Sequence, residues 1–241
     1  MTECPVVFLT AVIPAFNEQE CIAECIQEVR GVLTGIRRPF EIVVVDDGST
    51  DGTVNVLRRL KPAVPELRII AFSRNRGQSA AMSAGFEYAR GEVVVTLDAD
   101  QQNDPADIPK LLDQMDRFDV VCGVRANRCD NVIRKVSSRI ANRVRNRLTH
   151  ENISDTGCSL KMFRAKYLRK IKLYEGMHRF LPTLLRMEGA RVTELPVNHR
   201  PRTKGQAKYG VWNRLFKSTR DLFAVRWMQA RHIAYEVREE I

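Results

Sequence analysis

The chain has 241 residues and a formal net charge of +10, and 44% of its residues are hydrophobic. This length and composition suit one α/β domain with a sizeable core and exclude a disordered chain. No run approaches the ~18 consecutive apolar residues of a membrane span, and the N-terminus lacks a signal-peptide pattern. We therefore expect a cytoplasmic protein that does not cross a membrane. Its six cysteines lack zinc-site spacing and are interpreted as reduced and partly buried.

Charge is distributed unequally along the chain. Residues 1–116 carry a net charge of −7, whereas residues 117–241 carry +17. This asymmetry predicts an acidic half that uses a metal and a basic half that meets an anionic surface or ligand. Nucleic acid is the weaker candidate because none of its recognition signatures is present, so an anionic membrane is favoured.

Strands and helices alternate along the first hundred residues. Apolar or β-branched runs predict strands at 8–13, 40–45, 67–72 and 93–97, and helical spacing of apolar residues predicts helices at 18–33, 54–60 and 79–90. Pro14 is expected to end the first strand. The alternation predicts an α/β fold with a parallel, doubly wound sheet.

The second half is more basic and more irregular. It predicts a helix at 108–115, a strand at 119–124, an amphipathic basic helix at 132–149, a strand within 155–163, helices near 164–171 and 179–188, and a strand at 192–195. Residues 200–231 mix nine Lys/Arg with aromatic residues, and Asp221 is their only acid. We expect a main domain at 1–210 and a basic amphipathic tail at 211–241.

Two carboxylates follow the strand at 93–97. Asp98 and Asp100 are separated by one residue, and such a pair at a strand exit can share Mg²⁺ or Mn²⁺ with nucleotide phosphates. The spacing alone is a weak signal, because most Asp-x-Asp pairs solvate a loop. Asp104, before a proline, is interpreted as the cap of the next helix. The exits of other predicted strands also carry polar groups, namely Asn17/Glu18, Asp46/Asp47, Arg74/Asn75 and Arg125.

Two further features have competing interpretations. In the exit at 46–53, Ser49 or Asp51 could cap the following helix, while Asp47 could accept hydrogen bonds from a ribose or nucleobase. The basic tail could lie in the interface of an anionic membrane or dock on its own domain with a solvated basic face. Arg134 and Ser138 share one face of the basic helix, where an arginine and a hydroxyl can hold a phosphate.

Several ordered motifs, spread over residues 8–227, carry a family resemblance. They are Val-Ile-Pro-Ala-Phe-Asn-Glu at 12–18, Val-Val-Val-Asp-Asp-Gly-Ser-Thr-Asp at 43–51, Arg-Asn-Arg-Gly-Gln at 74–78, Asp-Ala-Asp at 98–100, Asp-Thr-Gly-Cys-Ser-Leu-Lys at 155–161, Met-His-Arg-Phe at 177–180 and Gly-Gln-Ala-Lys-Tyr at 205–209. The chain closely resembles the polyprenyl-phosphate glycosyltransferases of glycosyltransferase family 2, which include dolichol-phosphate mannose synthases and bacterial undecaprenyl-phosphate sugar transferases.

The resemblance implies a GT-A fold and a role for each matching residue. The donor nucleotide sugar would contact Pro14, Ala15, Asn17, Glu18, Asp47, Gln78, Asp98, Ala99 and Lys208. The metal, Mg²⁺ or Mn²⁺, would be held by Asp98, Asp100 and Gln102. The acceptor phosphate would be held by Arg125, Arg134 and Ser138. Arg202 and Lys208 would close over the donor phosphates. The catalytic candidates are Asp100, Asp155 and Arg202, although Asp155 could instead orient Arg125 or Arg134.

The implied reaction is inverting transfer of a sugar from a UDP- or GDP-sugar to a polyprenyl phosphate by a protein peripheral on the inner face of the membrane. The alternatives are a non-catalytic nucleotide-sugar-binding subunit, or a family 2 enzyme with a polysaccharide or another acceptor. Many relatives continue after such a tail into membrane spans, so either the spans were removed from this chain or a separate transmembrane subunit presents the acceptor. The acidic residues Glu239 and Glu240 at the end of the chain favour the separate subunit. The sugar, the nucleotide and the oligomeric state are not readable from the motifs.

Overall fold

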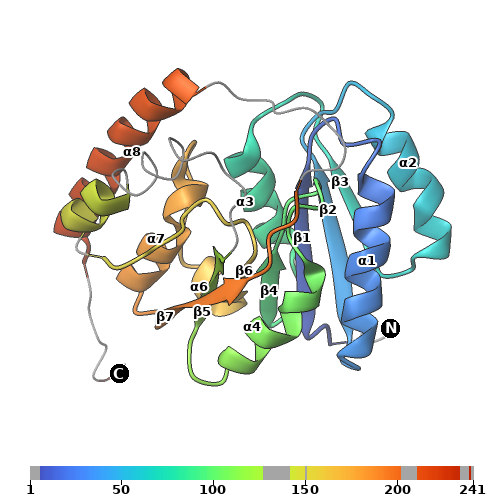
Figure 1. Cartoon of the computed structure of the whole chain (residues 1–241), viewed down its shortest axis with the longest axis horizontal. Helices are drawn as coiled ribbons and strands as arrows, with labels where there is room; N and C mark the ends of the chain where they lie inside the picture. Colours follow the sequence, from blue (N-terminus) through green and yellow to red (C-terminus); the bar gives the residue numbers. More distant parts are fainter. Residues whose placement is uncertain (1–5, 127–141, 150, 202–210, 234–238, 240–241) are drawn as a thin grey trace.

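One seven-stranded sheet organises the chain, in the order β3-β2-β1-β4-β6-β5-β7 (Figure 1). The computed structural model describes residues 6–126, 142–149, 151–201, 211–233 and 239, with the backbone alone for 211–218. The strands are β1 (Leu9–Ala15), β2 (Phe40–Asp46), β3 (Leu67–Ala71), β4 (Val93–Thr96), β5 (Val120–Arg125), β6 (Lys161–Arg164) and β7 (Val192–Val197).

The sheet is mostly parallel, as the sequence predicts, but β6 reverses direction. It pairs antiparallel with both β4 and β5, so that Lys161 lies opposite Thr96 and Cys122. A reversed strand begins at the edge where its parallel neighbours end. The loop that precedes β6 therefore lies at the same edge of the sheet as the carboxyl ends of β1, β2, β4 and β5.

Helices cover both faces of the sheet (Figure 1). The α-helices are α1 (Ile22–Gly35), α2 (Thr53–Leu60), α3 (Gln78–Tyr88), α4 (Ile108–Gln114), α6 (Ala165–Leu168), α7 (Leu181–Met187) and α8 (Val211–Arg231), and the short 3-10 helices are η1 (Lys61–Ala63), η2 (Pro105–Asp107) and η3 (Met177–Phe180). Residues 142–149 are also helical. Helices α1, α2 and α4 pack on one face, and α3, α6 and α7 on the other.

Alternation along β1 shows how the two faces are filled. Leu9, Ala11 and Ile13 belong to the core beneath α1, whereas Val12 belongs to the core beneath α3. The contact with α3 is close because Gly85 has no side chain: a Cβ there would overlap Val12 Cγ1. The buried strands thus read as continuous apolar runs, as expected for a sheet covered on both sides.

Some predicted boundaries are wrong. Strand β1 continues through Pro14, which pairs with Val45, and ends only at Ala15. Proline's fixed φ is compatible with an extended strand, and near the end of a strand its missing N–H removes only one ladder bond. Helix α1 begins at Ile22 rather than near residue 18, because the chain first makes a turn in which Glu18 O accepts from Ile22 N.

Helix α8 lies against the η3–α7 segment, at the side of the molecule away from α1 and α2 (Figure 1). Its Leu222 and Val225 are buried against Met177 and Phe180. Of the two interpretations of the tail, docking on its own domain is therefore confirmed for the described side chains of α8. None of the described helices is long and apolar enough to span a bilayer.

Candidate active site

Polar side chains meet along the edge where β1, β2, β4 and β5 end. They are Asp47 beyond β2, Asp98 beyond β4 and Arg125 at the end of β5, and the predicted donor contacts Pro14 and Ala15 lie at the end of β1 between the first two. Ala15 O accepts a hydrogen bond from Asp47 N at 2.8 Å, which joins the first two strand ends. The row predicted from separate strand exits therefore exists as one continuous edge.

Asp47 organises the loop between β3 and α3. Its buried carboxylate accepts from Asn75 Nδ2 at 3.0 Å, from Arg76 N at 2.7 Å and from Gly77 N at 2.8 Å. Charge-assisted bonds of this kind hold a loop firmly. The carboxylate thus positions the residues that lead into Gln78, and its contact with a ribose or base stays a prediction.

Asn17 ties the end of β1 to the turn after β2. Its Oδ1 accepts from Thr50 N at 2.8 Å, and its own N–H donates to Ser49 Oγ at 2.8 Å. Asp51, rather than Ser49, meets the first turn of α2, because its Oδ1 accepts from Thr53 N at 2.9 Å. The N-cap position of α2 is nevertheless Gly52, without a side-chain cap, so the prediction that Ser49 or Asp51 caps this helix is wrong. Asp51 instead holds the turn that leads into α2, and Ser49 supports the loop around Asn17.

The next residue, Glu18, is held in the same way. Its N–H donates to Thr53 Oγ1 at 2.9 Å. Asn17 adopts a left-handed backbone conformation, with φ of 52°. Such non-glycine residues are uncommon and cluster where a loop is over-determined by its surroundings.

Asp98 and Asp100 come together beyond β4. Gln78 Nε2 donates to Asp98 Oδ1 at 3.1 Å, and Gln101, which follows the pair, is left-handed with φ of 61°. Burial, together with the charge of Asp100, raises the pKa of Asp98 to about 6. A cation bound beside Asp98 would relieve this cost of ionising its carboxylate.

This donor set fits Mg²⁺ or Mn²⁺ bound together with a substrate. No group of three His, Cys, Asp or Glu side chains forms a metal cage in the part of the chain that the structure describes. Two carboxylates are sufficient for Mg²⁺ when phosphate and water oxygens complete its coordination. Gln102 is tied into the same loop, because its N–H donates to Asp100 Oδ1 at 3.2 Å, and its role as a third ligand stays a prediction.

Asn103 was not anticipated from the sequence. This buried amide accepts from Asp98 N at 3.2 Å and from Ser159 Oγ at 2.6 Å, and its backbone bridges to His199. It thus holds the carboxylate loop, the loop before β6 and the segment after β7 together. The only signal in the sequence was that Asn103 is an amide within an acidic turn. Such amides are too common for this signal to identify a functional residue. Asp104, by contrast, caps η2 as predicted, accepting from Ala106 N at 3.1 Å.

Arg125 and Asp155 form a two-pronged ion pair. Arg125 Nε lies 2.7 Å from Asp155 Oδ2, and Arg125 Nη2 lies 2.9 Å from Asp155 Oδ1. Gly157 leaves room for the guanidinium, since a Cβ there would lie 2.8 Å from Arg125 Nη2. The planar fork and the carboxylate match in shape, so the pair fixes the orientation of the arginine.

A cavity of about 300 Å³ is lined by Asp98 and by the loop that follows Asp155. Its lining residues come from the ends of β1 and β4, the start of α3, the loop before β6, and η3: Pro14, Gln78, Met82, Thr96, Leu97, Asp98, Thr156, Gly157, Cys158, Ser159, Lys161, His178 and Arg179. Lys161 Nζ donates to the carbonyl of Cys158, and so holds the wall of the cavity. Asp98 and Gly157 place the cavity between the expected metal and the expected acceptor phosphate.

Four of the predicted site residues lie outside the described residues. They are Arg134, Ser138, Arg202 and Lys208. The other predicted residues are placed along the edge or in the loops beside it, including Ala99, which is buried between the two carboxylates. His178 and Arg179 in the cavity wall were recognised as part of a motif, but the sequence did not indicate a role for them.

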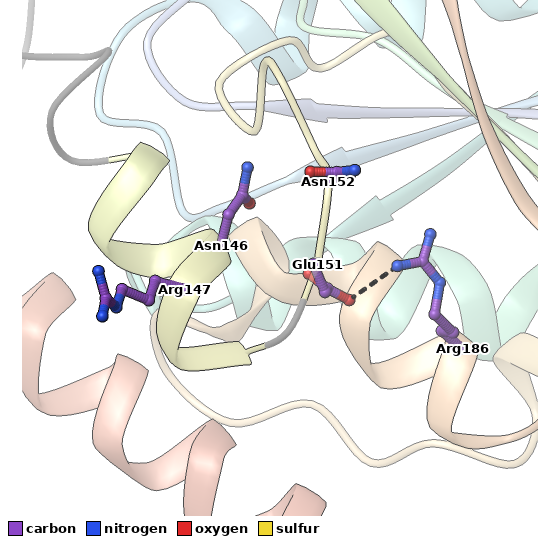
Figure 2. A pocket seen from close by; sticks show the side chains of 5 residues that line it. All are labelled: Asn146, Arg147, Glu151, Asn152 and Arg186. Atoms are coloured by element: carbon purple, nitrogen blue, oxygen red, sulfur yellow. Dashed lines mark ion pairs between the residues drawn. The ribbon is translucent and has the colours of Figure 1, made fainter.

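A second hollow, of about 650 Å³, lies between the 142–149 helix and α7 (Figure 2). Asn146, Arg147, Asn152 and Arg186 line it around Glu151, whose Oε1 lies 3.6 Å from Arg186 Nη1. Glu151 Oε2 also accepts from Thr183 Oγ1 at 2.6 Å, so this buried carboxylate joins the helix to α7. None of the strand-end residues lines this hollow. We therefore interpret the contacts of Glu151 as structural.

Comparison with known proteins gives a consistent result. Residues 10–172 match the family model for glycosyl transferase family 2. Dodecaprenyl-phosphate galacturonate synthase of Rhizobium johnstonii is 39% identical over 223 residues, which are 90% of this chain and 66% of that protein. Undecaprenyl-phosphate 4-deoxy-4-formamido-L-arabinose transferase of Edwardsiella ictaluri is 36% identical over 85% of this chain and 63% of that protein. The chain thus spans just under two thirds of these relatives.

Solved structures share the fold. A mannosyltransferase from Pyrobaculum calidifontis in complex with GDP-Man and Mn²⁺ has a TM-score of 0.64 at 20% identity, covering 94% of this chain and 65% of that chain. Glucosyl-3-phosphoglycerate synthase from Mycobacterium tuberculosis, in complex with Mn²⁺, UDP and phosphoglyceric acid, has a TM-score of 0.70 at 17% identity, covering 95% and 80%. The predicted GT-A architecture is confirmed.

Proposed function

The chain belongs to glycosyltransferase family 2, and on this premise we propose that it transfers a sugar from a UDP- or GDP-sugar to a polyprenyl phosphate with inversion. One observation carries the proposal: the cavity that joins the Asp98 carboxylate to the loop of the Arg125–Asp155 pair. An arginine oriented by a carboxylate at that end suits an anionic acceptor. The names of the two similar relatives, each of which contains a polyprenyl phosphate, support the same class of acceptor.

The leaving group is the nucleoside diphosphate, whose negative charge must be neutralised. Mg²⁺ or Mn²⁺ held by Asp98 and Asp100, with Gln102 as third ligand, would supply that neutralisation when bound. Asp47 and Gln78 would position the nucleotide end of the donor. Arg202 and Lys208, beyond the described residues, would close over the phosphates.

The acceptor needs little activation. A phosphate monoester has a second pKa of ~6, so its oxygen is largely ionised near neutral pH and no strong general base is required. A phosphate oxygen forms its bond to the anomeric carbon while the bond to the diphosphate breaks and the electron pair leaves with it. Arg125, with Arg134 and Ser138, would hold the phosphate in line. We assign Asp155 to positioning Arg125 rather than to proton transfer, because both of its oxygens bind the guanidinium.

The outer face of α8 suits the membrane on which such an acceptor resides. Phe223 and Trp227 are 61% and 66% exposed, although the opposite face of the helix is buried. Arg220 and Arg226 lie on the same helix. Aromatic rings beside arginines favour the interface of an anionic bilayer, so we place the protein peripherally on the inner face of a membrane. A separate transmembrane subunit as a partner remains a prediction.

The test is a donor panel of UDP- and GDP-sugars with a short polyprenyl phosphate, scored for nucleoside diphosphate and for the lipid product. Release should require both the lipid phosphate and Mg²⁺ or Mn²⁺, and Asp100→Ala should abolish it without unfolding the protein. The matching polyprenol without phosphate is the acceptor control. Donor binding with no turnover across the whole panel would instead favour a non-catalytic subunit, and full activity in EDTA would refute the metal.

A second assay tests the membrane placement. Co-sedimentation with anionic liposomes should weaken when Phe223 and Trp227 are both changed to serine, because both rings are exposed. The free energy of unfolding should change by no more than about 0.5 kcal/mol, as is usual for surface positions. Unchanged sedimentation of the double variant would refute the membrane-binding role of this face.

A further inference from the structure

The cavity that Asp98 lines is also lined by His178, which is linked to Ser79, and the proposed mechanism uses neither of these side chains. Ser79 lies in the first turn of α3, and His178 lies in η3, 99 residues later. Ser79 Oγ and His178 Nδ1 are 2.6 Å apart. Ser79 is buried, whereas His178 lines the cavity.

The hydrogen-bond geometry favours one position for the proton of the histidine ring. Gly176 N donates to Ser79 Oγ at 3.0 Å, so the serine oxygen already accepts one bond. The 2.6 Å separation from His178 is typical of an O–H donor and shorter than the ~2.9 Å that is usual for N–H···O bonds. Ser79 therefore donates to Nδ1, and in the neutral ring the proton resides on Nε2.

The order of groups along the edge indicates what occupies this cavity. The nucleotide end is assigned to the loops after β1 and β2, and the acceptor phosphate to Arg125 at the end of β5. The cavity lies between them, with Asp98 on one side and Gly157 on the other. The part of a nucleotide sugar that lies beyond its diphosphate, towards the acceptor, is the sugar itself.

We propose that His178, fixed by Ser79 with its proton on Nε2, donates a hydrogen bond to an oxygen of the transferred sugar. Ser79 is then a positioning residue for that contact. The inference rests on the proposed function for the identity of the ligand, but it concerns binding of the sugar and not its transfer.

Two substitutions separate the two ring nitrogens. His178→Asn keeps an acceptor near the position of Nδ1 but removes the Nε2 donor, whereas His178→Gln places an amide donor near the position of Nε2. Ser79→Ala removes the hydroxyl that fixes the tautomer. Ser83→Ala, one turn further along α3, is the matched control.

The discriminating measurement is calorimetric binding of two probes to each variant. One is the nucleotide sugar of the UDP- and GDP-sugar panel that the unmodified chain binds most tightly, and the other is the matching nucleoside diphosphate. His178→Asn should weaken binding of the nucleotide sugar about tenfold, the effect of one lost hydrogen bond of roughly 1–1.5 kcal/mol. It should leave the Kd of the nucleoside diphosphate unchanged.

The remaining variants make the test specific. His178→Gln should recover nucleotide-sugar affinity to within about threefold, Ser79→Ala should lose about threefold, and Ser83→Ala should lose nothing. Equal weakening of both probes by His178→Asn would show a merely structural role. No weakening at all, or no recovery with glutamine, would also overturn the proposal.

Nitrogen NMR of the imidazole ring gives an independent check. Nε2 of His178 should carry the proton in the unmodified protein, and Ser79→Ala should produce a mixture of tautomers. A ring protonated on Nδ1 would contradict the inference. Failure of the proposed function is measured separately, as absence of sugar transfer in the donor panel. The binding measurements test His178 whether or not the chain transfers the sugar.

Discussion

Asp98→Asn should make the metal-free protein more stable at neutral pH, although it removes a residue of the site. The pKa of Asp98 is raised from 3.8 to about 6, first by burial and then by the charge of Asp100. The folded state therefore holds a proton that the unfolded chain releases between about pH 4 and 6. Stability must fall as the pH rises through this window, because the folded state binds more protons there.

The size of the effect follows from the shift. About two pKa units at 1.36 kcal/mol each correspond to roughly 3 kcal/mol of stability lost by pH 7. Asparagine cannot ionise and does not suffer this loss. In EDTA at pH 7.5 the free energy of unfolding of Asp98→Asn should exceed that of the unmodified protein by about 3 kcal/mol, which is about 6–12 °C in Tm for a chain of this size. The difference should vanish near pH 4.

Urea denaturation across pH 4–8 in EDTA measures this difference, with the exposed Asp113→Asn as a control that should change little. Adding Mg²⁺ with a nucleoside diphosphate should reverse the ranking, since only the unmodified protein gains the binding energy. If Asp98→Asn is less stable than the unmodified protein at pH 7.5 in EDTA, the reasoning about an uncompensated carboxylate pair is wrong.

Three further changes have definite expected outcomes. Asp155→Asn should raise the KM for polyprenyl phosphate about tenfold while leaving the Kd for the donor unchanged, because Arg125 loses its partner; a steady-state series in each substrate checks this. Asp47→Ala removes the acceptor of three loop hydrogen bonds, so it should lower the free energy of unfolding by about 2–4 kcal/mol in urea and weaken nucleotide binding in a thermal-shift assay. Gly85→Ala places a Cβ against Val12 and should cost about 1–3 kcal/mol by thermal denaturation, with no change in metal dependence.

The strands and their polar exits were predictable because each is a local pattern. A buried parallel strand is an uninterrupted apolar run, and it must stop where carboxylates such as Asp47 or Asp98 begin. The prediction that these exits meet at one edge needed only the rule that parallel strands end together. The direction of β6 was not accessible in this way, since four residues cannot show which neighbours a strand will choose.

The contacts that position the site were harder to predict. Asn103 and the Ser79–His178 pair are made by segments far apart in the chain, and neither changes the local pattern of its own segment. Pro14 misled for the opposite reason. Its general tendency to end strands is strong, but the ladder with Val45 continued past it. Local sequence patterns thus identify the polar residues at the strand ends, whereas contacts between distant segments decide how the side chains of these residues are held.

The docking of α8 has a consequence for how sugar preference could change. Leu222 and Val225 pack on Met177 and Phe180, which flank the two cavity residues of η3. A Cβ at Gly176, just before η3, would meet Asp221 of α8. A substitution on the inward face of α8 would therefore displace the cavity wall without touching the site. Selection for a new sugar should recover variants in this helix, and grafting a tail from a relative should carry part of that relative's preference with it.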